Sequence, residues 1–180
     1  MDRIEFLQCL FSWLTKRCTN DKDRHLAVLN FLSRVSIHNP FATPKYDDEI
    51  FVTDPIVLLE IGLMQCGQVN RIGHDIFASV GYKTRLVNLK NHTISEIFYN
   101  DNWHYFDADT ISNGLCILNP DTEEIPSVKE INETALLQNM LDSMNIYTEA
   151  TVAYNQRGSH SSITSFYCEN PQNYGGGVLV

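Results

Sequence analysis

Three polar residues in the middle of the chain carry the groups that covalent acyl transfer uses: Cys66, His92 and Asp107. In such chemistry a thiolate attacks a carbonyl carbon, an imidazole carries the proton, and a carboxylate holds the imidazole in the correct tautomer. An apolar stripe predicts a helix over 66–80 that begins at or next to Cys66 and stops at Gly81. A helix N-terminus favours the thiolate, and its amides can stabilise an oxyanion.

The two partner residues fall on a predicted sheet. Residues 82–89, 92–100 and 102–108 are rich in β-branched and aromatic side chains and are predicted as three strands. Asn100-Asp101 suits a two-residue hairpin turn between the last two strands. The order in this region is therefore helix, strand, strand, strand.

The register of that hairpin decides whether His92 and Asp107 meet. With a two-residue turn, Tyr99 faces Asn102, and Asp107 lies opposite Ile94. His92 and Asp107 then share one face as diagonal neighbours, about 7–8 Å apart at Cα. A slip of one residue would place them on opposite faces.

The rest of the chain predicts helices around this core. Apolar periodicity indicates helices over 1–17, 22–37 and 127–145, and Asp54-Pro55 opens a short helix to about Glu60. We expect one domain over 1–154: helical over 1–80, a sheet over 82–109, and irregular or helical over 110–154. The Ser-, Gly- and Asn-rich segment 155–180 is expected to be a flexible tail.

Composition excludes several classes of partner and site. The net charge of −9 leaves no basic surface for nucleic acid or anionic membranes, and no apolar run is long enough to span a bilayer. The five cysteines are widely spaced without a C-x-x-C pair, which argues against disulfides and against a closed zinc site. A glycan on the triplet Asn91-His92-Thr93 would block the site. With no signal-like N-terminus, a cytoplasmic, bacterial setting is expected.

Three sequence blocks resemble the core of the transglutaminase-like superfamily. They are Gln65-Cys66-Gly67, Asn91-His92-Thr93-Ile94-Ser95-Glu96-Ile97 and Trp103-His104-Tyr105-Phe106-Asp107-Ala108-Asp109. The order and spacing of these blocks are family-like over 66–110. Their residues are similar to those of peptide N-glycanase members and bacterial transglutaminase-like proteins. Residues 111–180 carry no such resemblance.

The resemblance implies an α+β, papain-like fold, with a nucleophile-bearing helix packed on an antiparallel sheet and additional N-terminal helices. It implies Cys66 as nucleophile, His92 as general acid and base, and Asp107 as orienting carboxylate. Members cleave or exchange amide bonds, as transglutaminases, peptidases or amidases that remove glycans from Asn. For this chain we expect acyl transfer on a peptide, protein or glycopeptide amide through a thioester intermediate, without a cofactor. Several members place an aromatic residue upstream of the cysteine to complete the oxyanion hole. Here Tyr46 and Gln65 are the candidate substitutes.

The sequence also offers further candidate site residues and two alternative functions. Gly67 leaves room for a substrate carbonyl, and Trp103 shares the predicted face of Asp107 as a further cleft candidate. Asp109 is interpreted as a cap for the following loop rather than a cleft residue. The alternatives in function are an idle binding or scaffold module on the same fold and a zinc-dependent hydrolase with Cys66, His92 and Asp107 as ligands.

Overall fold

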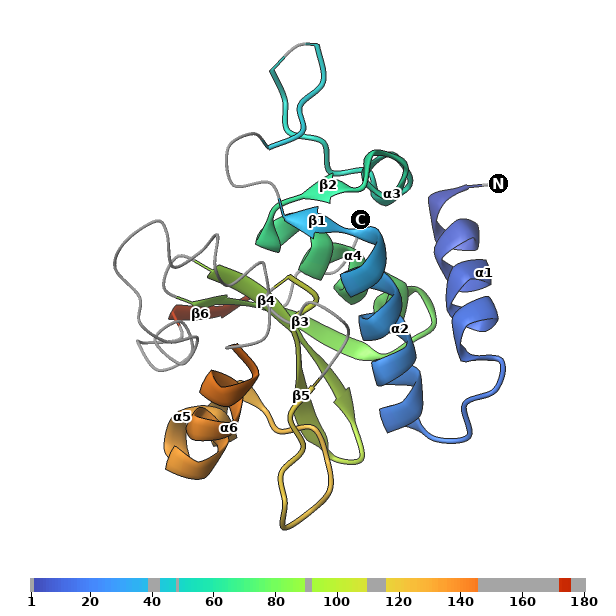
Figure 1. The fold of residues 1–180 in the computed structure, drawn as a ribbon. Helices are drawn as coiled ribbons and strands as arrows, with labels where there is room; N and C mark the ends of the chain where they lie inside the picture. The colour runs from blue at the N-terminus through green and yellow to red at the C-terminus, as the bar shows by residue number, and fades with distance from the viewer. Residues whose placement is uncertain are drawn as a thin grey trace.

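The computed structural model describes residues 2–38, 43–47, 49–89, 92–109, 116–145 and 172–175. The helices are α1 (Arg3–Thr15), α2 (Asp21–Val35), α3 (Pro55–Ile61), α4 (Cys66–Ser79), α5 (Val128–Glu133) and α6 (Ala135–Asn145). The strands are β1 (Ile37–His38), β2 (Leu63–Met64), β3 (Lys83–Leu89), β4 (His92–Tyr99), β5 (Asn102–Phe106) and β6 (Gln172–Gly175). Figure 1 shows how they are arranged.

Local sequence signals set the helix ends. The Asn20 side chain accepts a hydrogen bond from the backbone N–H of Asp23 at 2.8 Å and caps α2. The Asp54 carboxylate accepts from the N–H of Ile56 at 2.8 Å at the start of α3. Gly62 ends α3 with a φ of 71°, a left-handed conformation that a residue with a Cβ rarely adopts. The predicted N-terminal helices are therefore confirmed.

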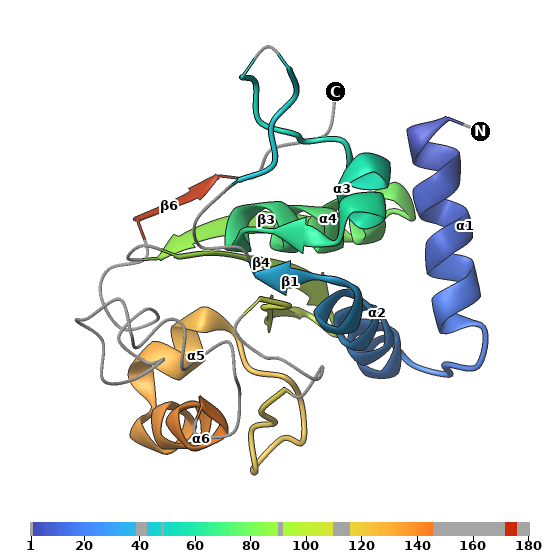
Figure 2. The same cartoon turned by 45° about the horizontal axis from the view of Figure 1, so that its top comes forward.

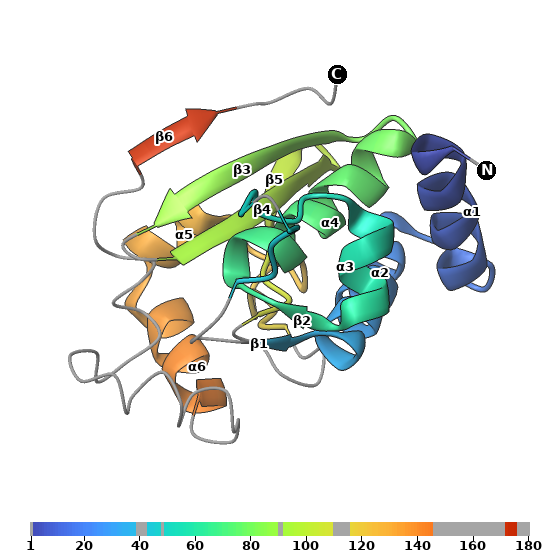
Figure 3. The ribbon, with the colours of Figure 1, turned by 90° about the horizontal axis from the view of Figure 1, so that it is seen from above.

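The larger sheet is antiparallel, in the order β5-β4-β3-β6. The turn between β4 and β5 places Asn100 at φ 48° and Asp101 at φ 60°, as a type I′ hairpin requires. Tyr99 consequently pairs with Asn102, so the predicted hairpin register is confirmed. Strand β6 lies beside β3 at the edge of the sheet (Figure 3).

Helices cover both faces of this sheet. On one face, α1, α2 and α4 build a core with residues of β4 and β5 that include Ile97 and Phe106. On the other face, α5 and α6 pack over Val87, Ile94 and Tyr105. Figure 2 shows α4 on one side of the sheet and the orange helices α5 and α6 on the other. The predicted α+β class, with the nucleophile-bearing helix on an antiparallel sheet, is confirmed.

Helix α4 sits unusually close to the sheet at Gly73. A Cβ added to Gly73 would lie 2.3 Å from Cε1 of Phe106, a side chain that is fully buried. Only a residue without a side chain permits this approach. The contact fixes the height of α4 above β5, and with it the position of Cys66 at the beginning of the helix.

Three features differ from the sequence prediction. The helix predicted over 127–145 is divided into α5 and α6, because Thr134 has an extended backbone with φ −125° and ψ 105°. The parallel pair β1–β2, two residues long on each side, was not predicted. Strand β6 falls within the predicted tail 155–180, the rest of which lies outside the described residues. Among the described helices, none has both the length and the apolarity that a membrane crossing requires.

Candidate active site

Cys66 is the first residue of α4, as predicted. The backbone N–H of the preceding Gln65 donates to Oε1 of Gln68 at 3.0 Å, and Nε2 of Gln68 donates to the carbonyl of Val52 at 2.8 Å. These two bonds tie the first turn of α4 to the loop that precedes α3. They hold Cys66 in place at the start of the helix. The residue is partly exposed, so a ligand can reach it.

His92 and Asp107 form a buried pair. Nε2 of His92 lies 2.8 Å from Oδ2 of Asp107, and both side chains are 0% exposed. His92 opens β4, and Asp107 follows the last residue of β5, so the hairpin register brings them together at one end of the sheet. The sequence analysis placed them as neighbours on this basis.

The charge state of His92 follows from its two partners. Burial disfavours the imidazolium and by itself lowers the pKa of His92. The Asp107 carboxylate, through its charge and its hydrogen bond, and Cys66, through a hydrogen bond and its charge, outweigh burial and raise that pKa well above its ordinary value. A raised pKa favours the imidazolium form of His92. Because its Nε2 is bonded to Asp107, the ring nitrogen that serves Cys66 is Nδ1.

Asn70 joins helix α4 to strand β4 and to the chain that follows β5, and the sequence analysis did not predict this role. Its Nδ2 donates to the carbonyl of Thr93 at 2.9 Å and to Oδ1 of Asp107 at 3.2 Å. Its Oδ1 accepts from the N–H of Ala108 at 2.8 Å. Asn70 is fully buried, one helical turn after Cys66. The available signal was an amide side chain on the buried stripe of a helix, where a polar group requires partners.

Asp109 belongs to the same cluster. One side-chain ligand atom each of Cys66, His92 and Asp109 lie within 4.8 Å of one another. The carboxylate thus lies beside the sulfur and the imidazole, a position that the interpretation as a loop cap did not include; the loop over 110–115 lies outside the described residues. Its own N–H donates to Oδ1 of Asp107 at 3.2 Å, so the short turn after β5 brings two carboxylates to the site.

The remaining candidates from the sequence in this part of the chain are Gly67, Gln65 and Tyr46. Gly67 is in the first turn of α4, where an added Cβ would lie 3.9 Å from Cβ of Thr93. Gln65 is the N-cap residue of α4 and immediately precedes Cys66. Tyr46 is 43% exposed and lies in the loop before α3.

Trp103 is not brought to the cluster. It pairs with Phe98 next to the hairpin turn, and the Arg85 guanidinium lies 4.1 Å above its ring. His92 is six residues from Phe98 along the strand, which corresponds to about 20 Å. The structure thus places Trp103 at the opposite end of the hairpin from the proposed nucleophile.

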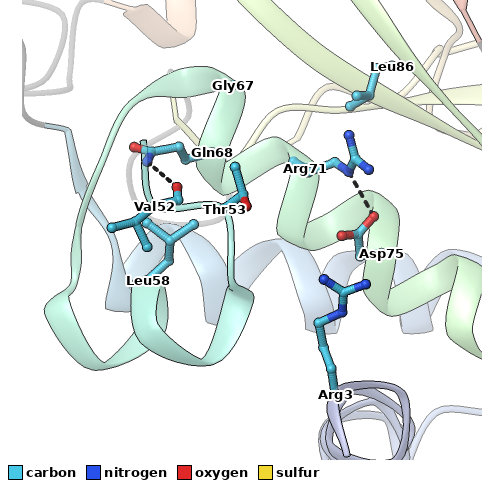
Figure 4. A pocket seen from close by; sticks show the side chains of 9 residues that line it. All are labelled: Arg3, Val52, Thr53, Leu58, Gly67, Gln68, Arg71, Asp75 and Leu86. Carbon is cyan, nitrogen blue, oxygen red and sulfur yellow. Dashed lines mark hydrogen bonds and ion pairs between the residues drawn. The ribbon is translucent and has the colours of Figure 1, made fainter. Parts of the chain in front are cut away.

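A cavity of about 380 Å³ adjoins the start of α4. The residues that line it, shown in Figure 4, are Arg3, Val52, Thr53, Leu58, Gly67, Gln68, Arg71, Asp75 and Leu86. Gly67 is shared between this cavity and the first turn of the nucleophile helix. On its polar side, Nε of Arg71 donates to Oδ1 of Asp75 at 3.0 Å, and Nδ1 of the buried His74 lies 2.8 Å from the same oxygen. The cavity thus adjoins the residue that follows Cys66.

Cys116 offers a contrast to Cys66. It packs against both hydrophobic clusters, and burial together with the charge of Asp107 raises its pKa to about 12, despite a hydrogen bond with Tyr105 that lowers it. A thiol with such a pKa carries very little thiolate at neutral pH. Among the described cysteines, Cys66 is the one placed beside an imidazole.

Two solved structures resemble this chain in fold. A candidate cysteine protease from Cytophaga hutchinsonii superposes with a TM-score of 0.49 at 15% sequence identity, over 58% of this chain and 37% of that one. A structure described as a TGase superposes with a TM-score of 0.44 at 13% identity, over 76% of this chain and 36% of that one. The chain thus spans little more than a third of the length of either. No family model and no curated protein matches the sequence.

What the cluster can do chemically follows from its own geometry. A helix bearing Cys66, packed on an antiparallel sheet bearing His92, is the α+β arrangement that the sequence resemblance to the transglutaminase-like superfamily implies.

Proposed function

We propose that this chain is a cysteine-dependent acyl-transfer enzyme that acts on an amide bond through a thioester intermediate. One observation carries the proposal: the sulfur at the start of α4 lies within 4.8 Å of an imidazole nitrogen of His92, and Nε2 of that imidazole is paired with Asp107 at 2.8 Å. A thiolate, a proton carrier and an orienting carboxylate in this order are the components of nucleophilic acyl transfer.

The first half of the reaction uses the raised pKa of His92. The Cys66 thiolate attacks the carbonyl carbon and forms a C–S bond, while the electron pair of the C=O bond moves to oxygen. The backbone N–H groups of Cys66 and Gly67 have no acceptor within the helix, because they belong to its first turn, and they are placed to bind this oxyanion. Collapse of the intermediate breaks the C–N bond, and Nδ1–H of His92 gives its proton to the leaving amine.

The second half reverses these roles. Neutral His92 accepts a proton at Nδ1 from water or from an amine as that group attacks the thioester, and the C–S bond breaks to restore the thiolate. Throughout, Nε2–H stays bonded to Asp107, which keeps the lone pair of the imidazole directed at the reacting groups. Hydrolysis and transamidation differ in the attacking group alone, so both fall within the proposal, with a peptide, protein or glycopeptide amide as substrate.

The direct experiment is to trap the thioester. The purified chain is incubated with a mixture of short amidated and glutamine-containing peptides, quenched in acid and examined by intact mass spectrometry. We expect an added acyl mass on Cys66 that hydroxylamine removes, because hydroxylamine cleaves thioesters. The Cys66→Ser variant should carry no hydroxylamine-sensitive mass, and the Cys9→Ser variant, altered at an exposed cysteine, should behave as the wild type.

Two outcomes would contradict the proposal. A stable, unmodified protein that binds such peptides without forming an adduct would favour the scaffold function instead. An adduct that persists in Cys66→Ser would place the nucleophile elsewhere.

A further inference from the structure

We infer that Cys66, His92 and Asp109 form a reversible Zn²⁺ site that switches the proposed enzyme off by capturing its nucleophile. The inference concerns the regulation of the same site, so its inhibitory consequence rests on the proposed function. The binding itself rests on the positions of three ligand atoms and on the residues behind them.

The geometry of the three atoms suits a small tetrahedral ion. A sulfur, an imidazole nitrogen and a carboxylate oxygen lie within 4.8 Å of one another. Zinc binds such ligands at about 2.0–2.3 Å, so tetrahedral ligands around one ion lie about 3.5 Å apart. Side-chain rotations that move each ligand atom by about 1 Å would shorten the separations from at most 4.8 Å to about 3.5 Å. The residues come from the start of α4, the start of β4 and the turn after β5, which are already held together.

The hydrogen-bond partners of His92 are of the kind found behind the histidine ligands of zinc centres. A histidine that binds zinc donates its other ring N–H to a carboxylate in most such sites, which fixes the ring. Here Nε2 of His92 is paired with Asp107 at 2.8 Å, and Asp107 is in turn held by Nδ2 of Asn70 at 3.2 Å. With Nε2 paired to Asp107, Nδ1 of His92 is the ring nitrogen that would bind the metal in this arrangement.

The donor types and charges select zinc over the hard cations. One thiolate, one neutral imidazole and one carboxylate carry two negative charges, which balance a divalent ion in a poorly hydrated place. His92 is 3% exposed and Asp109 is 7% exposed. Mg²⁺ and Ca²⁺ prefer oxygen ligands, whereas a sulfur–nitrogen–oxygen set suits Zn²⁺. Zinc requires the neutral imidazole and the thiolate, so binding is expected to weaken as the pH falls.

The consequence for the enzyme is loss of both reactive groups at once. The sulfur lone pair that would attack a carbonyl is donated to zinc, and the nitrogen that would transfer the proton is occupied. Three protein ligands leave the fourth position of a tetrahedral ion to water. This arrangement is also that of a hydrolytic zinc site, so the experiment must separate inhibition from zinc-dependent hydrolysis.

The test uses the full chain, free of affinity tags and stripped of metal. Zinc chloride is titrated by calorimetry, and bound metal is counted after desalting. We expect one zinc per chain in the wild type, at least a 10-fold weaker dissociation constant in Asp109→Asn, and no comparable site in Cys66→Ser. Asp121→Asn, altered at an exposed loop carboxylate, is the matched control and should bind as the wild type. Substitution with Co²⁺ should give a sulfur-to-cobalt charge-transfer band that Cys66→Ser lacks.

The second readout is protection of the thiol. One equivalent of zinc should suppress alkylation of Cys66 by iodoacetamide at least 10-fold, and a chelator should restore it. Zinc bound with equal affinity by wild type, Cys66→Ser and Asp109→Asn would overturn the site. Zinc that raises amide hydrolysis would overturn the inhibitory role.

The two proposals fail separately. Inert Cys66 in the metal-free protein, together with zinc binding that needs Asp109, would remove the proposed acyl transfer and keep the zinc site. Rapid alkylation of Cys66 without any zinc binding would do the reverse.

Discussion

Replacing Asp107 with Asn tests how the carboxylate controls the imidazole. Oδ1 of Asp107 accepts from Nδ2 of Asn70 and from the N–H of Asp109, both at 3.2 Å, while Oδ2 faces Nε2 of His92 at 2.8 Å. An amide has one oxygen and one NH₂ group, so it can accept on one side only. With its oxygen toward the two donors, its NH₂ faces His92 and forces the tautomer that carries the proton on Nδ1.

The size of the effect follows from the bond that is lost. Both side chains of the His92–Asp107 pair are 0% exposed, and a hydrogen bond to a charged group contributes about 1.5–3 kcal/mol. If this energy supports the reactive state alone, the rate falls about 10- to 150-fold. The altered tautomer adds to that loss, because Nδ1–H cannot take a proton from the thiol.

The assay is the second-order rate of Cys66 alkylation by iodoacetamide at pH 7, followed by mass spectrometry, with far-ultraviolet circular dichroism to confirm the fold. Asp109→Asn is the matched comparison. Its carboxylate lies beside the sulfur and is not the partner of Nε2, so removing its negative charge should leave the rate unchanged or raise it. A normal rate in Asp107→Asn with a large loss in Asp109→Asn would refute this reasoning and assign the supporting role to Asp109.

Three further predictions concern packing, the helix–sheet link and pH. Gly73→Ala should destabilise the protein by about 1–3 kcal/mol in chemical denaturation, because the new Cβ would overlap the ring of buried Phe106. Asn70→Ala should cost about 1–3 kcal/mol for each buried partner left unsatisfied and should also slow alkylation of Cys66, because Asp107 loses a donor. The raised pKa of His92 predicts a stabilising contribution that is fully present below about pH 6.5 and is lost as the pH rises through the folded-state pKa. The difference in unfolding free energy between wild type and His92→Gln should therefore be largest below about pH 6.5 and shrink as the pH rises above that value.

Each of these has a control and a contrary result. Gly67→Ala, whose Cβ would make an ordinary 3.9 Å contact with Thr93, should retain stability, and equal losses at both glycines would contradict the packing argument. Asn70→Ala with an unchanged alkylation rate would restrict Asn70 to a purely structural role. A stability difference for His92→Gln that grows with pH would mean that His92 is neutral in the folded protein.

The elements that the sequence predicted are those with local, repeating signals. The start of α4 at Cys66 follows from an apolar stripe of helical period with Gly81 beyond it. The hairpin register follows from two residues, Asn100 and Asp101, that tolerate positive φ. Because side chains alternate along a strand, that register was sufficient to place His92 beside Asp107.

The parts that were missed depend on packing between elements distant in sequence. No strand pattern says which helix residue reaches the end of the sheet, so Asn70 was not identified. The turn after Asp107 follows neither a helical nor a strand period, so the position of Asp109 beside Cys66 could not be read from spacing. Strands of two residues, such as Ile37–His38, are too short for any periodic signal.

The most direct test of the central claim is site-resolved alkylation at pH 7. The wild type and His92→Gln are treated with a limiting amount of iodoacetamide, and the modified cysteines are quantified by peptide mapping. We expect Cys66 to be alkylated at least 10-fold faster than exposed Cys9 in the wild type and to lose that advantage in His92→Gln. Equal reactivity of Cys66 in the two proteins, or faster modification of another cysteine, would contradict an imidazole-activated nucleophile at the start of α4.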